Sequence, residues 1–420
     1  MTRNTIRLGI LCRVTAAGLL VALLSACHRT GEIRPEHPNA AAPTALPAPP
    51  TGPSGTAAPQ EVLGNGSHAG SSAMDPDTMV AHFINVGQGD ATLLEFSCAA
   101  MLIDTGGEST HRVSGNVLLQ NYLEAFFARR PDLDRTLQLV VLSHPHADHT
   151  HGVSVLLNAD PAIRIMNVVD DGTPGAHDSG RSGQVALESY AQSTPGVGYA
   201  GLAEADIPAP TGLTSHVIDP INCHKGGSGV DPKISAFWGR VHSDQAWATD
   251  PNNNSVVLRV AFGKSVFLFM GDLRDHGISA MLDAYSDDLS MFDADVLKVG
   301  HHGSANGTTA DLVAAVTPKI AVIQSGDSTP DNEQFSAYAF GHPNTAALAL
   351  LLDPTHGVSM DRSQPAVNVR VGVKGRNPKT HAKPSFTTQT FTKAIYDNAW
   401  DGNIDVTAKA DGDLSVQTEH

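Results

Sequence analysis

The chain has 420 residues and a formal net charge of −16, with 43 acidic against 27 basic side chains. This balance lacks the general electrostatic footprint of a nucleic-acid binder, although a local basic strip would not show in the total. Beyond residue 24 no apolar run is long enough to span a bilayer, so we do not expect this chain to translocate a substrate itself.

Residues 1–27 have the pattern of a secretory signal: a lead with three arginines, the apolar run 14–24 and small residues before Cys27. The apolar run is too short for a transmembrane helix. The residues LSAC resemble a bacterial lipobox, which makes Cys27 the expected lipid attachment site, and the alternative is a plain signal with a chance cysteine. His28 stands where an aspartate would retain a lipoprotein in the inner membrane. We therefore expect the chain in the cell envelope, on the periplasmic face of the outer membrane.

Residues 28–78 are rich in Pro, Ala, Gly and Ser and have no apolar periodicity, which predicts a disordered tether. Residues 79–420 are then long enough for one large layered domain. Within that domain Cys98 and Cys223 remain. In an oxidising compartment they could form a disulfide, and the alternative is two buried thiols, because sequence separation says nothing about their distance.

Apolar segments bounded by glycine and polar turns predict the secondary structure of the domain. The expected strands are at residues 79–87, 91–96, 100–103, 137–142, 255–262, 265–270, 294–299 and 319–324. The expected helices are at residues 115–130, 308–316 and 345–352. Strands interleaved with helices over the whole length predict a layered α/β sandwich, and the loops that leave strand ends are where such a scaffold places its chemistry.

Residues 143–151 read SHPHADHTH and directly follow an apolar strand. His144 and His146, at positions i and i+2, can flank one ion from a turn, and Asp148 and His149 then face a second position. Imidazole and carboxylate donors without a thiolate suit Zn²⁺ first, with Mn²⁺ or Fe as alternatives. The competing interpretation is a polar surface loop, but four histidines beside an aspartate argue against it.

Two later strands also end in candidate ligands. Asp272 closes the strand FLFMGD, and a carboxylate placed between two ions can bridge them. His301 and His302 follow the strand that ends in LKVG. Taken singly, each is typical of an ordinary turn. The prediction of a metal centre depends on all three groups leaving apolar strands, because strand ends can meet at a shared edge of a sheet.

These residues and their surroundings resemble the metallo-β-lactamase superfamily, and within it the DNA-uptake competence protein ComEC and its standalone relatives. The motifs that carry the resemblance are FINVGQGDATLLEF, LIDTGG, VVLSHPHADHTHG, NNNSVVLRV, FLFMGDL, ADVLKVGHHGS and FGHPNTAALALL. The ending WDGNIDVTAKADGDLSV resembles the closing strand pair of the family. The likeness extends over residues 79–416 and implies a four-layer αββα sandwich with a metal site at one edge.

The resemblance implies two divalent metal ions and assigns ligands by position. The implied ligands are His144, His146, Asp148, His149, Asp272 and His301. In this assignment the first two histidines hold one ion, the Asp148–His149 pair holds the other, and Asp272 bridges them. His301 completes the second site.

Further residues gain roles from the same resemblance. His302 is expected beside the substrate as a catalytic group, with the reverse assignment of the His301–His302 pair left open. Asp148 is expected to orient the attacking water as well as to bind metal. Asp104 in LIDTGG is expected to support the ligands, and Asn254 and His342 are expected to line the substrate pocket.

The sequence departs from the superfamily at the first metal. A separate histidine that often completes this site has no obvious counterpart, and Asp171 is our substitute, with His177 and His216 as rivals. This departure puts full occupancy of the first site in doubt. Residues 353–395 are longer and more polar than the return to the closing strands needs, which predicts an inserted loop, and residues 170–250 are expected to form a rim around the site.

The preferred hypothesis is a hydrolase that uses metal-activated water, because ions in such a centre supply hydroxide near neutral pH. The resemblance favours a phosphoester substrate, including nucleic acid, although the acidic charge weakens DNA as the specific substrate. The alternatives are an amide, lactone or thioester hydrolase with the same ligands, and a non-catalytic lipoprotein that binds metal or a partner. The intact ligand set argues against the last of these.

Overall fold

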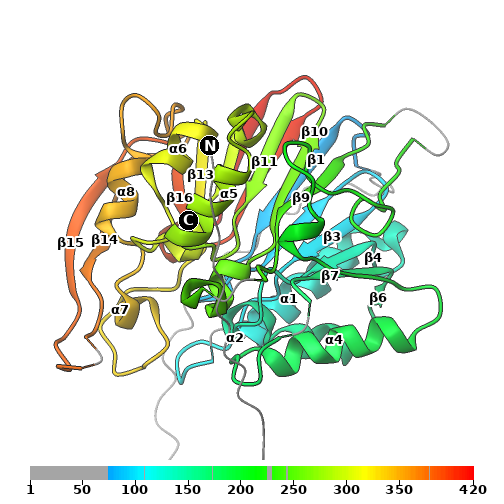
Figure 1. The fold of residues 1–420 in the computed structure, drawn as a ribbon, viewed down its shortest axis with the longest axis horizontal. Coiled ribbons are helices and arrows are strands. Elements are labelled where there is room, and N and C mark those ends of the chain that lie inside the picture. Colours follow the sequence, from blue (N-terminus) through cyan, green and yellow to red (C-terminus); the bar gives the residue numbers. More distant parts are fainter. Residues whose placement is uncertain (1–73, 108, 173, 225–228, 243–244, 378) are drawn as a thin grey trace, which may run out of the picture. The chain divides into compact units, whose positions relative to one another are not determined.

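The computed structural model describes residues 74–107, 109–172, 174–224, 229–242, 245–377 and 379–420 (Figure 1). The predicted signal at 1–27 with Cys27, and most of the predicted tether at 28–78, lie outside the described residues. The first strand, β1 (Thr78–Phe83), begins next to the predicted start of the domain. None of the helices in the described ranges has the length and apolar character that a membrane span requires.

The larger sheet has eight strands in the order β18-β17-β1-β2-β3-β5-β7-β8. Besides β1, its strands are β2 (Thr92–Glu95), β3 (Ala100–Ile103), β5 (Leu139–Val141), β7 (Asn167–Asp170), β8 (Gly198–Gly201), β17 (Ile404–Lys409) and β18 (Leu414–Thr418). The strands from β18 to β3 pair antiparallel, and β3, β5, β7 and β8 pair parallel. The closing pair β17–β18 is the hairpin that the C-terminal motif predicts.

The smaller sheet has six strands in the order β16-β13-β12-β11-β10-β9. Its strands are β9 (Lys233–Trp238), β10 (Val257–Phe262), β11 (Ser265–Phe269), β12 (Val296–Lys298), β13 (Ile320–Ile323) and β16 (Ile395–Asp397). The predicted hairpin β10–β11 is antiparallel, and from β11 to β16 the neighbours are parallel. Parallel pairing of β11 with β12 brings the residues that follow both strands to one edge.

Alternation along the strands separates two apolar layers, because successive side chains of a strand point to opposite faces. Leu94, Met101 and Val141 face the core between the two sheets. Their neighbours Leu93 and Leu102 face a second core beneath the outer helices. The α1 side of the larger sheet and the α5, α6 and α8 side of the smaller sheet are each covered by helices (Figure 1). The predicted αββα layering is therefore confirmed.

Nine α-helices lie in the described ranges. They are α1 (Gly115–Arg129), α2 (Ala147–Thr150), α3 (Val153–Leu157), α4 (Arg181–Ser193), α5 (Asp275–Ala284), α6 (Ala310–Val316), α7 (Ala337–Phe340), α8 (Thr345–Leu351) and α9 (Asn398–Asp401). Short 3-10 turns are η1 (Pro131–Leu133), η2 (Glu204–Asp206), η3 (Ala246–Thr249), η4 (Pro251–Asn254), η5 (Leu289–Phe292) and η6 (Gly300–Gly303). Two short strands, β4 (Thr136–Leu137) and β6 (Arg164–Ile165), form a separate parallel pair.

The segment predicted as an inserted loop at 353–395 contains a β-hairpin. Its strands, β14 (Val367–Lys374) and β15 (Ser385–Phe391), form a two-stranded antiparallel sheet. Figure 1 shows this hairpin at the side of the domain away from α4. Valines alternate along β14, and Val369, Val371 and Phe391 are buried. Polar residues on the outward face hid this pattern, because a half-exposed hairpin is only half apolar.

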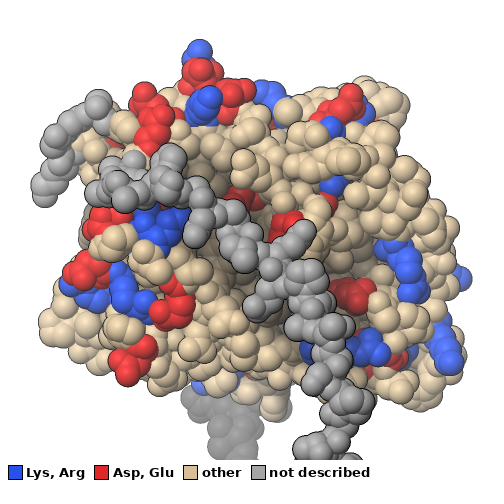
Figure 2. Space-filling model, turned by 180° about the vertical axis from the view of Figure 1, so that it is seen from behind, with Lys and Arg blue, Asp and Glu red and all other residues tan. Residues whose placement is uncertain are grey.

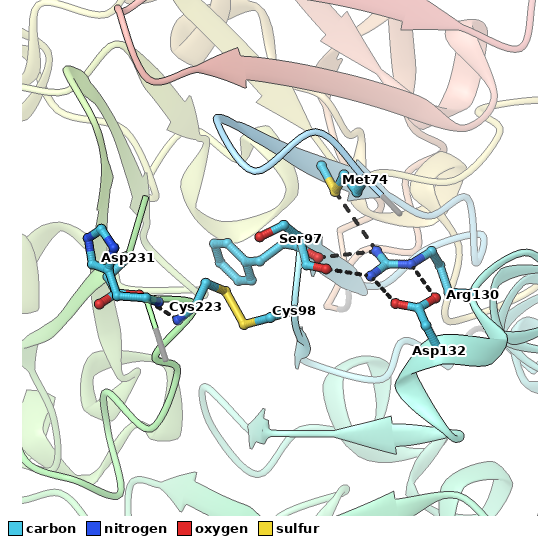
Figure 3. Close-up of a disulfide and its surroundings, with 9 residues drawn as sticks. Met74, Ser97, Cys98, Arg130, Asp132, Cys223 and Asp231 are labelled. Atoms are coloured by element: carbon cyan, nitrogen blue, oxygen red, sulfur yellow. Dashed lines mark hydrogen bonds and ion pairs between the residues drawn. A yellow bond between two sulfur atoms is a disulfide. The ribbon is translucent and has the colours of Figure 1, made fainter. Parts of the chain in front are cut away.

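A disulfide links a turn of the larger sheet to the loop that leads into the smaller sheet. Cys98, in the turn between β2 and β3, bonds to Cys223 in the loop before β9, with Cα atoms 5.4 Å apart (Figure 3). Of the two alternatives that the sequence leaves open, the structure has the disulfide. Beside it, the buried guanidinium of Arg130 donates to the carbonyl oxygen of Ser97 at 2.9 Å and to the carboxylate of Asp132 (Figure 3). Two links thus fix the β2–β3 turn.

The end of β2 carries a buried charge cluster around Glu95. Its carboxylate accepts from Arg130 at 2.7 Å, from Arg129 at 3.1 Å and from the ring of His82 at 2.9 Å. Burial alone would raise the pKa of Glu95, but hydrogen bonds from His82 and Arg130 outweigh it and lower the pKa to about 2. The folded state therefore gains stability from Glu95 above its unfolded pKa, and loses it as the pH falls towards 2.

We expect Glu95→Gln to lower the free energy of unfolding by about 3 kcal/mol at pH 7, because the buried Arg130 then keeps only one of its two carboxylate partners, the partly exposed Asp132. The difference from the wild type should shrink as the pH falls from about 4.5 to 2, where the native carboxylate takes up a proton. Urea unfolding at several pH values measures this. Glu124→Gln, which breaks a half-exposed pair with Arg135, is the control and should cost less than about 1 kcal/mol. Equal losses for the two variants at pH 7 would refute the buried-cluster account.

Candidate metal centre

The candidate centre lies where strands of both sheets end. In the larger sheet β3 is followed by Asp104 and the parallel β5 by Ser143 and His144. In the smaller sheet β11 leads to Asp272 and the parallel β12 to the His301–His302 turn. The backbone N–H of Val256 donates to the carbonyl of Ser143 at 2.8 Å, which ties the two edges together. Parallel pairing within each sheet thus explains why residues far apart in sequence meet here.

The loop after β5 supplies the first group of side chains. His144 is fully buried, and its Nε2 lies 3.0 Å from Nδ1 of His146. Helix α2 begins at Ala147 and carries Asp148 and His149 in its single turn. His149 is buried, whereas the side chain of Asp148 is 29% exposed and lines a cavity. The structure therefore brings the four residues predicted from HxHxDH together.

Asp272 is the common neighbour of the histidines. Its Oδ2 lies 3.3 Å from Nε2 of His149 and 3.3 Å from Nε2 of His302. The same oxygen is 3.9 Å from Nε2 of His144 and 3.8 Å from Nε2 of His301. One carboxylate oxygen therefore faces both the His144 side and the His149–His302 side, which is the placement expected of a bridging ligand.

The two adjacent histidines have different surroundings. His302 is buried, with Nε2 3.2 Å from Asp148 and Nδ1 2.8 Å from the carbonyl of Gln324. His301 is partly exposed, lines the cavity, and has Nδ1 2.9 Å from Oδ1 of Asn306. Both residues have positive φ, so their side chains do not point to opposite faces as consecutive side chains of a strand do. The structure thus favours the reverse of our first assignment, with His302 among the ligands and His301 facing the substrate space.

Asp90 belongs to the centre and was missed by the sequence analysis. Asp90, His149, Asp272 and His302 each offer one potential ligand atom, these atoms lie within 4.8 Å of one another, and all four residues are buried. Asp90 Oδ1 is 3.1 Å from Nδ1 of His302, and Lys298 forms an ion pair with its other oxygen. Its position in the sequence could have indicated this, because Asp90 ends the GQGD turn just before β2, as Asp104 comes just after β3.

The GQGD turn also explains one glycine. Gly89 has φ +151, and a Cβ atom there would lie 2.5 Å from the backbone oxygen of Asp148. The N–H of Asp90 donates to the same oxygen at 3.0 Å. The turn therefore packs directly on the metal-binding helix, and only glycine leaves room for that approach.

Asp104 holds the ligand loop in place. Its carboxylate accepts from the backbone N–H of Ser143 at 2.7 Å and from the Ser143 hydroxyl at 2.7 Å. The ring Nδ1 of His149 lies 2.9 Å from the same carboxylate. A carboxylate at Nδ1 fixes the ring so that Nε2 faces a metal, which is the supporting role that LIDTGG led us to expect.

The electrostatic potential at Asp272 favours a cation. Burial opposes protonation of His149 and His302, but the carboxylates around each ring, Asp272 foremost, hold both pKa values well above the usual value. His144 differs, because burial and its histidine neighbours hold its pKa well below the usual value. A metal ion would replace protons on the first two rings and find the third already neutral.

These residues fit a divalent metal. Nε2 of His149, Nε2 of His302 and Oδ1 of Asp272 are buried and have no hydrogen-bond partner in the described structure. Buried polar atoms without partners call for a ligand, a water or an ion. Imidazole and carboxylate donors without thiolate suit zinc, manganese or iron.

A cavity of about 580 Å³ opens above the centre. Asp148, Asp272 and His302 reach it from below, and Phe335 and Phe340 lie on its rim. His342 also lines it, as predicted for a pocket residue, and its Nδ1 lies 3.2 Å from the side chain of Gln88.

Two predicted residues lie elsewhere. Asp171 accepts from Gln184 at 2.8 Å and lines a second cavity of about 590 Å³. Asn254 lines that second cavity as well, with its amide bonded to the backbone of Val241 and Ala248. The rivals for the missing ligand, His177 and His216, are exposed. The structure therefore brings neither Asp171 nor its rivals into the group of potential ligand atoms at Asp272.

Comparison with known proteins agrees with this architecture. The family model of the metallo-beta-lactamase superfamily matches residues 84–327. ComE operon protein 3 of Bacillus subtilis is 24% identical over 323 residues, covering 74% of this chain and 35% of that protein. Competence protein ComA of Neisseria gonorrhoeae is 32% identical over 114 residues, or 27% and 14% of the two chains. The chain thus spans about a third or less of the length of these relatives.

Among solved structures, the metallo-beta-lactamase fold protein YhfI from Bacillus subtilis aligns with 59% of this chain and 85% of its own, at 13% identity and a TM-score of 0.34. The family assignment itself depends on the family model, which matches more than half of the chain. The relatives also agree with the predicted likeness to competence proteins of the ComEC type. This chain belongs to the metallo-beta-lactamase superfamily.

Proposed function

We propose that the chain is a metal-dependent hydrolase of phosphoester bonds in single-stranded nucleic acid, acting in the cell envelope. The observation that carries the hydrolase is the single Asp272 oxygen that faces histidines from both sheets. The names of its relatives, which refer to competence, support nucleic acid as the substrate class. Two divalent ions in this centre would supply a water activated at neutral pH and positive charge facing the bond that breaks.

The chain's own residues have separate tasks in this proposal. Asp148 is the carboxylate of the centre that is partly open to the cavity, so it can orient the attacking water and accept its proton. His301 and His342 face the same space and can donate hydrogen bonds to phosphate oxygens. Asp104 keeps the ring of His149 fixed, so that the geometry is set before substrate arrives.

The rim of the cavity fits a nucleobase. Phe335 is 69% exposed, an unusual exposure for a phenylalanine, and its ring lies 5.9 Å from that of Phe340. The ring of Phe340 lies 5.5 Å from that of His342. Exposed aromatic faces beside a hydrolytic centre can stack bases without regard to sequence, which is the common mode of binding single strands.

The charge distribution on the face in Figure 2 is not that of a surface that binds a long duplex. On the face in Figure 2, basic and acidic side chains of the described residues are interspersed and much of the uncovered surface is neutral. A substrate bound mainly through base stacking and the metal centre needs fewer phosphate contacts than a duplex bound along a basic strip. We therefore favour short single-stranded segments over duplex DNA.

The envelope location is proposed from two features. Lipid on Cys27 would anchor the chain, and the Cys98–Cys223 disulfide is typical of an oxidising compartment. Membrane association that survives Cys27→Ser would contradict the lipid anchor.

The substrate class is tested on the purified full chain, stripped of metal and reloaded with Zn²⁺ or Mn²⁺. We expect turnover of bis-p-nitrophenyl phosphate and of a labelled single-stranded oligonucleotide, and its loss on chelation. An amide, lactone or thioester hydrolase is the second candidate, favoured by the net charge of −16, which disfavours polyanions. Turnover confined to lactone, thioester or β-lactam substrates would establish that candidate and reject phosphoesters.

The aromatic rim gives a sharper form of the same test. Phe335→Ala should raise the KM for the oligonucleotide about 5-fold to 160-fold, since base stacking on an aromatic side chain contributes roughly 1–3 kcal/mol. An oligonucleotide without bases at its central positions should show no such difference. Leu289→Ala, which removes an exposed apolar side chain from another surface, is the control. Equal effects of Phe335→Ala on both oligonucleotides would contradict base stacking.

A further inference from the structure

Three consecutive asparagines follow Pro251 in η4, two residues before β10. Asp250 caps this turn by accepting from the N–H of Asn252 at 3.1 Å. The next residue after the turn, Ser255, accepts through its hydroxyl from the N–H of Asp272 at 3.0 Å. The Ser255 hydrogen bond and the pairing of β10 with β11 therefore hold the asparagine turn next to Asp272.

In two of the three asparagines, both the oxygen and the nitrogen of the side-chain amide form hydrogen bonds within the protein. Asn253 accepts from the N–H of Gly277 at 3.1 Å and donates to the carbonyl of Trp247 at 2.8 Å. Asn254 accepts from Val241 and donates to Ala248. These side chains fix the loop and need no further ligand.

Asn252 differs from its neighbours. It is only 6% exposed, and its Oδ1 is buried without a hydrogen-bond partner in the described structure. It lines the same cavity as His146, Asp148 and Asp272. A buried carbonyl without a partner costs about 1–3 kcal/mol, so the native protein is expected to supply one.

Among the described residues, the first metal position lacks a further protein ligand besides His144, His146 and the shared Asp272. His144 and His146 are at hand on one side of Asp272, whereas Asp171, the substitute expected from the sequence, lies in the second cavity. Amide oxygens are accepted ligands of divalent cations, though weaker than carboxylate or imidazole because they carry no charge. The unpartnered Oδ1 of Asn252 therefore belongs to the same cavity lining as His146 and Asp272, where the first metal position is short of a ligand.

We propose that Asn252 Oδ1 completes the first metal position, beside His144, His146 and the shared Asp272. The neutral donor makes this position the weaker of the two. This inference rests on the metal centre of the proposed function, but not on the bond that is hydrolysed.

Zinc binding to the metal-free full chain tests the proposal without any activity assay. Titration against a chromophoric chelator, with metal counted after dialysis, should give two Zn²⁺ per wild-type chain with unequal affinities. Asn252→Ala should weaken the lower affinity about 10-fold or more and leave the higher one unchanged. Asn252→Asp should tighten the lower affinity, because it places a carboxylate where the amide stood.

Asn253→Asp is the matched control, since it adds the same charge one residue away on a side chain that faces Gly277. Tightening by Asn252→Asp but not by Asn253→Asp supports the assignment and cannot come from a damaged fold. Unchanged affinities in Asn252→Ala, or equal tightening in both aspartate variants, would overturn it. If Asp272→Asn retains both zinc ions, the metal centre of the proposed function is wrong. If Asp272→Asn loses them while Asn252→Ala keeps both, only the assignment of Asn252 as a ligand is wrong.

Discussion

Asp272→Asn should abolish most turnover and most metal binding at once. One Asp272 oxygen lies within 3.9 Å of the Nε2 atoms of His144, His149 and His302, so neutralising it would remove the charge that both ions are proposed to share. Loss of several kcal/mol of charge stabilisation corresponds to a fall in kcat/KM of about 10³-fold or more. Steady-state rates on the phosphodiester, with metal content measured on the same samples, check this prediction.

The control for Asp272→Asn is Asp283→Asn, which changes an exposed aspartate on the nearby helix α5. It should leave rate and metal content at the wild-type level. Circular dichroism establishes that both variants are folded. If Asp272→Asn turned over at the wild-type rate, Asp272 would not be the bridge, and a centre built on its oxygen would have to be abandoned.

Removal of the disulfide should have the largest effect on stability. The Cys98–Cys223 bond joins residues 125 positions apart, and a link of this span restricts the unfolded chain strongly. Cys98→Ser/Cys223→Ser should therefore lower the free energy of unfolding by about 3–5 kcal/mol. Denaturant unfolding of the metal-free chain measures the loss without the contribution of bound ions.

A reducing agent provides the matched control. The wild type under strong reduction should unfold at the denaturant concentration of the double variant, and the double variant should not respond to the reductant. A wild-type midpoint that is the same with and without reductant would contradict the stabilising role of this bond.

Much of the fold follows from apolar periodicity. The 3.6-residue spacing of Leu119, Leu123 and Phe126 predicts α1, and the strands β10 and β11 are largely apolar runs joined by a Gly-Lys turn. Helix α4 was not predicted, because of its 13 residues only Gln184, Leu187 and Ala191 are buried. An apolar stripe that narrow is hidden among polar residues, although it is enough to pack a helix at the edge of a sheet.

The sequence predicted those site residues that follow apolar strands. It did not predict those whose side-chain direction depends on the local backbone conformation. His144 and Asp272 follow apolar strands within three residues, His149 lies in the short helix α2 that comes next after β5, and the structure brings the three together. The order of His301 and His302 depends on two residues with positive φ, a conformation that their sequence does not signal. Asp90 was overlooked because a GQGD turn is also typical of an ordinary strand boundary.

Direct location of the metal ions is the sharpest test of the centre. Crystals of the full chain grown with Mn²⁺ or Zn²⁺ and measured at the absorption edge of the metal should show two anomalous peaks flanking the carboxylate of Asp272. One peak should lie on the side of His144 and the other on the side of His149 and His302. Peaks found only away from Asp272, or none in crystals whose protein was shown to carry metal, would contradict the account.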